Sequence, residues 1–210
     1  MAVEVLEQKK QRLYTIEEYF EMEETAAFKS EFRNGKIVPI AGGTISHNRL
    51  KITISSLLFM LALQTKNFEA FYSDQKIYLP EYAHSVYADA SVVVGEPKMY
   101  KDGNHAILNP TLIIEVLSNS TSNYDRSAKF RKYQTLESFQ EYVLIDQEMP
   151  VIDVLTKQGE RDWRMKTYIG LEDEVHFESI NVTLKMADIY QKVKDLKDPQ
   201  AALEFNPKEE

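Results

Sequence analysis

The chain contains no cysteine among its 210 residues, so it can form no disulfide and no thiolate zinc site. Histidine, the other common zinc ligand, is scarce as well. The four histidines are scattered and form no HxH or HxxxH pair; they are His47, His84, His105 and His176. A bound metal would therefore depend on carboxylate ligands, which suit Mg2+, Mn2+ or Ca2+.

Long hydrophobic runs are also missing. The longest apolar stretch, LKITISSLLFMLAL, is interrupted by Lys51 and by serines, and it is shorter than the roughly 20 residues that a membrane span needs. It predicts a core helix instead. The amino-terminal MAVEVLEQKKQRLY is charged throughout and lacks the apolar core of a signal peptide. We therefore expect a cytoplasmic protein with no membrane segment.

Positive charge is in deficit, because 25 Lys and Arg face 33 Asp and Glu, which gives a net charge of −8. This balance argues against a protein that coats nucleic acid through its overall field, although it does not exclude a local basic groove. The densest basic cluster lies in YDRSAKFRKY and would suit a phosphate backbone. A solvated helix face is the commoner meaning of such a run.

The apolar periodicity predicts an α/β or α+β fold with a central mixed sheet flanked by helices. Thr15 and Glu18 form a capping-box pattern, and Asn34-Gly35 predicts a hairpin turn. A long helix is expected from Ser46, and further helices are expected in NYDRSAKFRKYQTL and MADIYQKVKDL. The expected strands are SEFR, GKIVPI, EAFYSDQKIYL, YADASVVVG, TLIIEVLS, EYVLID, VIDVLTK, WRMKTYIG and VHFES.

One domain is expected, because 24.4 kDa is enough for a single well-buried core and short for two. No internal repeat or low-complexity linker divides the chain. We expect an N-terminal extension over 1–13, one domain over 14–195 and a flexible polar tail over 196–210.

Two carboxylates interrupt apolar strands: Asp89 in YADASVVVG and Glu115 in TLIIEVLS. An ionised carboxylate is seldom buried unless it is paired or binds a metal. If the two strands are neighbours, the two anions lie close together and need a cation, for which a divalent metal with oxygen ligands is suited. The alternative is that both are strand-end acids that are solvated or paired with Lys or Arg.

Asp125, Lys129 and Tyr133 recur every four residues and are predicted to form a stripe along one face of a helix. Since this helix follows the Glu115 strand after a short loop, Lys129 could reach back toward the carboxylates. A lysine there would hold an attacking water or stabilise a phosphorane-like transition state as a point charge. The alternative is a helical Asp125–Lys129 pair beside a packed tyrosine.

The order and spacing of these segments resemble the Uma-two family of restriction-endonuclease-like proteins, within the PD-(D/E)XK nuclease superfamily. The resemblance covers roughly residues 14 to 190. It implies a restriction-endonuclease-like core with a metal-dependent phosphodiesterase site. The matching segments are YTIEEY, SEFRNGKIV, SHNRL, YADASVVV, IIEVLSNST, YDRSAKFRKY and EYVLID.

The resemblance implies that Asp89 and Glu115 are the Asp and the (D/E) of the motif. Two positions depart from the pattern: Ala88 stands where the motif has proline, and Leu117 stands where it has lysine. The resemblance implies that the lysine has moved to the following helix, as Lys129. It also implies that Glu31 is an additional acid of the site, and that four residues support the site, namely His47, Ser118, Asp125 and Tyr133. His47 alone could equally be a helix-cap or packing residue.

These expectations combine into a Mg2+- or Mn2+-dependent endonuclease that hydrolyses DNA, with Asp89, Glu115 and Glu31 as metal ligands and with Lys129 as the cation that orients or activates water. Duplex cleavage would be simplest for a homodimer. The main alternative is a catalytically inactive nuclease fold that serves as an interaction or nucleic-acid-binding module, which the acidic charge and the missing motif lysine favour. Hydrolysis of a smaller phosphoester is a third possibility.

Overall fold

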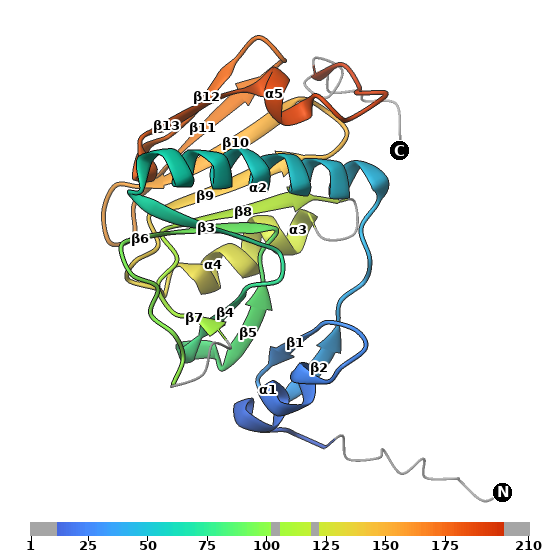
Figure 1. Cartoon of the computed structure of the whole chain (residues 1–210), viewed down its shortest axis with the longest axis vertical. Helices are drawn as coiled ribbons and strands as arrows, with labels where there is room; N and C mark the ends of the chain where they lie inside the picture. The colour runs from blue at the N-terminus through green and yellow to red at the C-terminus, as the bar shows by residue number, and fades with distance from the viewer. Residues whose placement is uncertain (1–11, 102–105, 119–121, 200–210) are drawn as a thin grey trace, which may run out of the picture.

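The chain folds into a mixed α+β structure in which helices flank β-sheets (Figure 1), and this confirms the fold class expected from the sequence. The computed structural model describes residues 12–101, 106–118 and 122–199. Most of the predicted N-terminal extension (1–13) and of the predicted tail (196–210) lies outside these residues. Within the described ranges, no helix combines the length and the apolar composition that crossing a membrane would require.

The larger sheet has six strands in the order β11-β10-β9-β8-β6-β3. Only β8 and β9 run parallel to each other, and the other neighbouring pairs are antiparallel. The strands are β3 (Phe68–Tyr72), β6 (Ala90–Val94), β8 (Leu112–Leu117), β9 (Glu141–Asp146), β10 (Val151–Lys157) and β11 (Trp163–Ile169).

Strand β8 lies inside this sheet, between β9 and β6, and all six of its residues are buried. A strand covered on both faces needs apolar side chains at successive positions, which explains the near-continuous run TLIIEVLS. Asp89 directly precedes β6, and β6 is the antiparallel neighbour of β8, with Ala90 opposite Ile114. The segments that carry Asp89 and Glu115 are therefore adjacent.

Helix α2 (Ile45–Thr65) crosses one face of the six-stranded sheet (Figure 1). Its buried residues Leu50, Ile54 and Leu58 belong to the largest apolar cluster, together with residues of β6, β8, β9 and β10. The same cluster includes residues of α5 (Met186–Tyr190) and of the hairpin formed by β12 (Glu174–Phe177) and β13 (Val182–Lys185).

A second apolar cluster joins the six-stranded sheet to a helical segment and to a second sheet. It packs Tyr133 and Leu136 against β8 residues on one side and against Ile77 and Val86 on the other. The helical segment consists of α3 (Ser122–Tyr124), a π-helical turn η2 (Asp125–Lys129) and α4 (Phe130–Tyr133). It is therefore held between the two sheets.

The second sheet has five strands in the order β2-β1-β5-β4-β7. Helix α1 (Ile16–Glu24) packs on it through Ile16, Tyr19 and Phe20. The strands are β1 (Ser30–Arg33), β2 (Lys36–Pro39), β4 (Lys76–Leu79), β5 (His84–Tyr87) and β7 (Ala106–Ile107), and the single turn η1 (Pro80–Tyr82) links β4 to β5.

Local sequence signals correctly predicted one hairpin turn and the starts of two helices. Thr15 caps α1 through a capping box with Glu18. Asn34 and Gly35 both have positive φ, 46° and 85°, as the predicted hairpin turn requires. Helix α2 begins at Ile45, one residue before the predicted start, because the Thr44 side chain accepts a hydrogen bond from the His47 backbone N–H.

Three predicted elements differ from the structure. EAFYSDQKIYL is not one strand: a turn separates β3 from β4, and the two strands belong to different sheets. The final helix ends at Tyr190 and is preceded by β13, which was not predicted. NYDRSAKFRKYQTL is helical but contains the π-helical turn η2. The periodicity of apolar residues does not show where one strand divides into two or where a helix ends, because these boundaries depend on pairing and packing with distant parts of the chain.

A buried carboxylate ties β9 to the turn η3 (Glu178–Ile180). Glu141 is fully buried and accepts hydrogen bonds from the backbone N–H groups of Glu178 (3.0 Å) and Ser179 (3.1 Å), from Ser179 Oγ (2.7 Å) and from Thr156 Oγ1 (3.1 Å). It satisfies donors that would otherwise be buried without a partner.

Replacing Glu141 with alanine is therefore expected to lower the free energy of unfolding by roughly 2–4 kcal/mol, because the stranded donors lose their acceptor. Urea unfolding monitored by circular dichroism would measure the change. Glu174→Ala, at an exposed position of β12, is the control and is expected to change stability by less than about 0.5 kcal/mol. Equal effects of both substitutions would contradict the structural role of Glu141.

Candidate functional site

Asp89 lies where the chain passes from the five-stranded to the six-stranded sheet, between β5 and β6. Its Oδ2 accepts a hydrogen bond from the Val116 backbone N–H (2.8 Å), and its Oδ1 lies 3.1 Å from His47 Nε2. Burial acts to raise the pKa of Asp89, but the His47 contact and the Val116 N–H outweigh it, so the pKa lies below its usual value. Asp89 is held as an anion.

The His47 side chain contacts Asp89 and does not cap helix α2. The cap of α2 is Thr44, whereas the His47 ring, from the first turn of α2, reaches Asp89. Its other ring nitrogen, Nδ1, is buried and has no hydrogen-bond partner among the described residues. Helix α2 thus brings a group that is distant in sequence to the Asp89 carboxylate.

The Glu115 side chain, on the central strand β8, contacts a lysine and a tyrosine of the helical segment. Its Oε1 lies 2.7 Å from Lys129 Nζ and accepts a hydrogen bond from Tyr133 OH (3.0 Å). The side chains of Glu115 and Lys129 are only 5% and 8% exposed. The Lys129 ammonium also donates to the Tyr87 carbonyl (3.2 Å), and its Nζ lies 3.8 Å from Asp125 Oδ1.

The π-helical turn η2 sets the direction of Lys129. Asp125 and Lys129 are its first and last residues, and both are buried. Single π-turns inside helices widen the helix locally and occur frequently at functional sites. The Asp125 carbonyl here accepts a hydrogen bond from Tyr142 OH (3.1 Å), which anchors the turn to β9.

The site holds more negative than positive charge. Burial raises the pKa of Glu115 to about 8; Lys129 opposes this rise, and the carboxylates of Asp125 and Asp89 add to it. Burial lowers the pKa of Lys129, but Glu115, Asp125 and Glu31 outweigh it and raise the pKa above its usual value. Lys129 therefore stays protonated, and one ammonium is shared among several acids.

Glu31 and Ser118 are the two remaining residues that the sequence predicts for the site. Glu31 is buried on β1, and its Oε2 accepts hydrogen bonds from Arg33 Nε (3.0 Å) and Nη2 (2.7 Å), so it is already paired. Ser118 directly follows β8 and is half-buried. In the described part of the chain, no group of three or more His, Asp or Glu side chains is arranged to hold a metal ion.

Two contacts of the site were not anticipated from the sequence. The Tyr87 carbonyl that receives Lys129 is a backbone atom and has no side-chain signature. The Arg33 partner of Glu31 lies two residues away, on the same strand, so its side chain projects on the same face. That spacing was the available signal for Arg33.

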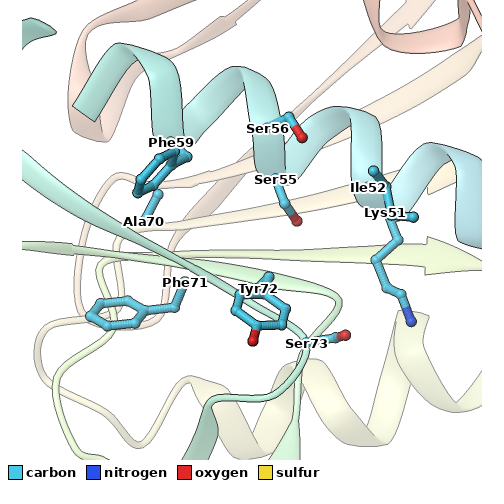
Figure 2. Close-up of a pocket in the computed structure, with 9 residues that line it drawn as sticks. All are labelled: Lys51, Ile52, Ser55, Ser56, Phe59, Ala70, Phe71, Tyr72 and Ser73. Carbon is cyan, nitrogen blue, oxygen red and sulfur yellow. The ribbon is translucent and has the colours of Figure 1, made fainter. Parts of the chain in front are cut away.

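A separate cavity of about 380 Å3 lies between α2 and β3 (Figure 2). Its walls include the apolar side chains of Ile52, Phe59 and Phe71, and Lys51 points along one end toward Ser73. None of the residues expected to act in the site lines this cavity. Buried ion-paired carboxylates, and not this apolar cavity, therefore define the candidate site.

Comparison with known proteins identifies the family. The family model Uma2, described as "Putative restriction endonuclease", matches residues 16–187. The chain belongs to the Uma2 family. Two similar Uma2 relatives come from Synechocystis: the uncharacterized protein sll1609 is 37% identical over 81% of this chain and 96% of its own length, and the uncharacterized protein slr1290 is 32% identical over 83% and 90%.

A solved structure shares the fold. It is the crystal structure of a putative nuclease belonging to DUF820 from Anabaena variabilis, with a TM-score of 0.67 and 18% identity, and the match covers 85% of this chain and 98% of that one. The family match confirms the resemblance to the Uma-two family seen in the sequence, and the structural match shows that the chain shares the fold of this DUF820 protein.

Beside the site, His84 on β5 titrates abnormally. Burial, Lys132 and Arg33 lower its pKa to about 4, so protons bind to the unfolded chain more readily than to the folded one between about pH 4 and pH 6.5. The contribution of neutral His84 to stability is therefore complete above pH 6.5 and is lost as the pH falls toward 4.

Replacing His84 with Asn is expected to flatten the fall in unfolding free energy between pH 6.5 and pH 4, because no imidazole remains to be protonated. Urea unfolding at several pH values would measure this. His176→Asn, on the separate β12-β13 hairpin, is the control and should leave the wild-type pH dependence in place. An unchanged slope in the His84 variant would contradict the burial of its neutral ring.

Proposed function

We propose that the chain is an endonuclease that hydrolyses DNA phosphodiester bonds with Mg2+ or Mn2+. The observation that carries this proposal is a buried lysine that contacts Glu115 and Asp125, beside the Asp89 anion at the junction of the two sheets. Such a concentration of buried charge is costly to fold, and functional sites are where proteins retain it. Membership of a family described as "Putative restriction endonuclease" supports the same reaction class.

The donor set suits a divalent ion. Mg2+ takes only one or two protein carboxylates and completes its octahedron with water and phosphate oxygens, so Asp89 and Glu115 are sufficient. Burial is the main cause of the raised pKa of Glu115, and the nearby carboxylates of Asp125 and Asp89 add to it, so a cation placed between these acids would be stabilised. An ion held there would neutralise phosphate charge and lower the pKa of a bound water. Glu31, already paired with Arg33, is proposed as an outer acid of the site.

The protein's own groups have separate parts in this proposal. The Lys129 ammonium would bind water or a phosphate oxygen at the site and would stabilise negative charge as it develops on that oxygen. Tyr133 and the Tyr87 carbonyl hold Glu115 and Lys129 in place, and His47 holds Asp89. Asp125 helps to keep Lys129 protonated. Ser118, at the end of β8, is proposed as a supporting residue.

The proposal includes a cytoplasmic homodimer. Two copies would present one site to each strand of a DNA duplex, which is the simplest route to duplex cleavage.

A catalytically inactive nuclease fold is the second candidate. The pairing of Lys129 with Glu115 and of Arg33 with Glu31 favours it, because both carboxylates already have protein cations. In that case the carboxylates would serve the structure, and the protein would act as an interaction or nucleic-acid-binding module.

Calorimetric titration of Mn2+ separates the two candidates. The wild-type protein is expected to bind Mn2+, and the Asp89→Ala/Glu115→Ala variant is expected to lose this binding because both carboxylate ligands are gone. Glu115→Gln is expected to lower metal-dependent DNA cleavage by roughly 100-fold or more. Wild-type protein that binds no Mn2+ would favour the inactive module.

The matched control is Glu141→Gln, which changes another buried strand carboxylate on the neighbouring strand β9. It should leave both Mn2+ binding and cleavage intact. Circular dichroism and thermal melting of every variant would exclude unfolding as the cause. Equal losses in the Glu141 and Glu115 variants would contradict the assignment.

Lys129→Met tests the role of the lysine. Mn2+ binding is expected to persist or strengthen, because the ammonium no longer competes for Glu115, whereas cleavage should fall by roughly 100-fold. Lys192→Met, at an exposed position, makes the same change of charge and serves as the control. Wild-type cleavage rates in the Lys129 variant would remove this residue from the proposed mechanism.

A further inference from the structure

A second group of cations surrounds the ring of Tyr124. The Arg33 guanidinium carbon lies 5.1 Å from the ring centroid, and Lys132 Nζ lies 5.2 Å from it. Lys132 Nζ also lies 3.2 Å from His84 Nδ1 and 3.3 Å from Tyr124 OH. Arg33, His84 and Lys132 come from β1, β5 and α4, so both the five-stranded sheet and the helical segment contribute to this cluster.

Lys132 has no carboxylate partner within 4 Å in the described part of the chain, although the chain is acidic overall. Its ammonium faces a tyrosine and an imidazole that is neutral at pH 7, because the pKa of His84 is about 4. Neither group neutralises it. An ammonium carries three N–H donors, and the described contacts account for two.

Arg33 also has a donor nitrogen that is available to a ligand. Its Nε and Nη2 donate to Glu31, whereas Nη1 makes no hydrogen bond among the described residues. Its side chain is 38% exposed, so an approaching ligand can reach it. Arg33 and Lys132 thus form a partly exposed cationic surface that Glu31 neutralises only in part.

The cluster adjoins the proposed cleavage site. Arg33 lies opposite His84 where β1 pairs with β5, and β5 ends at Tyr87, whose carbonyl accepts a hydrogen bond from Lys129. Tyr124 directly precedes Asp125, the first residue of the π-helical turn that carries Lys129. An anion bound at the cluster would therefore lie next to the phosphate that is proposed to be cleaved at the Asp89–Glu115 centre. A nucleic acid strand supplies successive anions of this kind.

We propose that Arg33, Lys132 and Tyr124 form a subsite for a backbone phosphodiester of the bound nucleic acid, adjacent to the phosphodiester that is cleaved. This inference rests on the proposed function. The guanidinium and ammonium would bind the phosphate oxygens, and Tyr124 would keep both cations in position through its ring face. Phosphate contacts of this kind fix the register of a nucleic acid on a protein and carry no sequence information.

Binding of a fluorescent DNA duplex, measured by anisotropy across a salt series without divalent ions, tests the subsite. Lys132→Gln is expected to weaken binding about tenfold at low salt and to reduce the slope of log K against log salt by about 0.9, the value for one lost phosphate contact. Lys132→Arg should restore most of both. Lys166→Gln, which alters another lysine over a tyrosine ring (4.4 Å from Tyr168), is the control and should match wild type.

Three outcomes would overturn the subsite: an unchanged salt slope in Lys132→Gln, an equal effect of Lys166→Gln, or wild-type protein that does not bind the duplex. A parallel titration of inorganic phosphate distinguishes a site for free phosphate from a site for the nucleic acid backbone. Loss of phosphate binding in Lys132→Gln with unchanged duplex binding would also overturn the assignment to a nucleic acid backbone. The binding assay contains no divalent ion, so it does not depend on cleavage. Duplex binding that depends on Lys132, together with no cleavage when Mn2+ is added in a separate assay, would refute the proposed nuclease activity and leave the subsite standing.

Discussion

The buried contact between Lys129 and Glu115 is the constraint around which the two sheets and the helical segment between them are organised. Removing two charges from water costs several kcal/mol per ion unless every remaining donor and acceptor is satisfied. The chain satisfies them with groups from separate elements: Tyr87 at the end of β5, Asp125 on the π-helical turn and Tyr133 on α4. Glu115 belongs to the six-stranded sheet, Tyr87 to the five-stranded sheet, and Lys129 with its other partners to the helical segment, so the charged centre links all three parts.

Much of this arrangement could be predicted from local sequence. Some signals lie within a few residues of each other: the cap at Thr15, the turn at Asn34-Gly35 and the apolar runs of β6 and β8. The structure contains the helix, the turn and the two strands that these signals predict. The four-residue spacing from Asp125 to Tyr133 was enough to assign these residues to one helix face. A carboxylate inside a buried strand is costly in any fold, which is why Glu115 could be chosen as a candidate site residue without knowledge of strand order.

The rest depends on long-range pairing or on backbone atoms. EAFYSDQKIYL reads as one strand, but its halves pair with β6 and β5 in different sheets, and no local pattern records that choice. The π-helical turn at Asp125 reflects contacts made by the folded segment, among them the hydrogen bond from Tyr142. The hydrogen bonds that Arg33 donates to Glu31 Oε2 are a further feature that the family motif does not record.

The proposed nucleic acid substrate is anionic, and the local distribution of positive charge reconciles that proposal with an acidic chain. Net charge sets the field at long range, whereas binding of a phosphate depends on cations within a few ångströms. In the helical segment Lys129 is buried against Glu115, and Lys132, three residues later, lies toward Tyr124 and His84. One short helix thus presents one cation inside the carboxylate centre and another beside it. A helix that only exposes a basic face to solvent has no need to bury a lysine. The burial of Lys129 beside the more exposed Lys132 therefore argues for a site and against a solvated basic face.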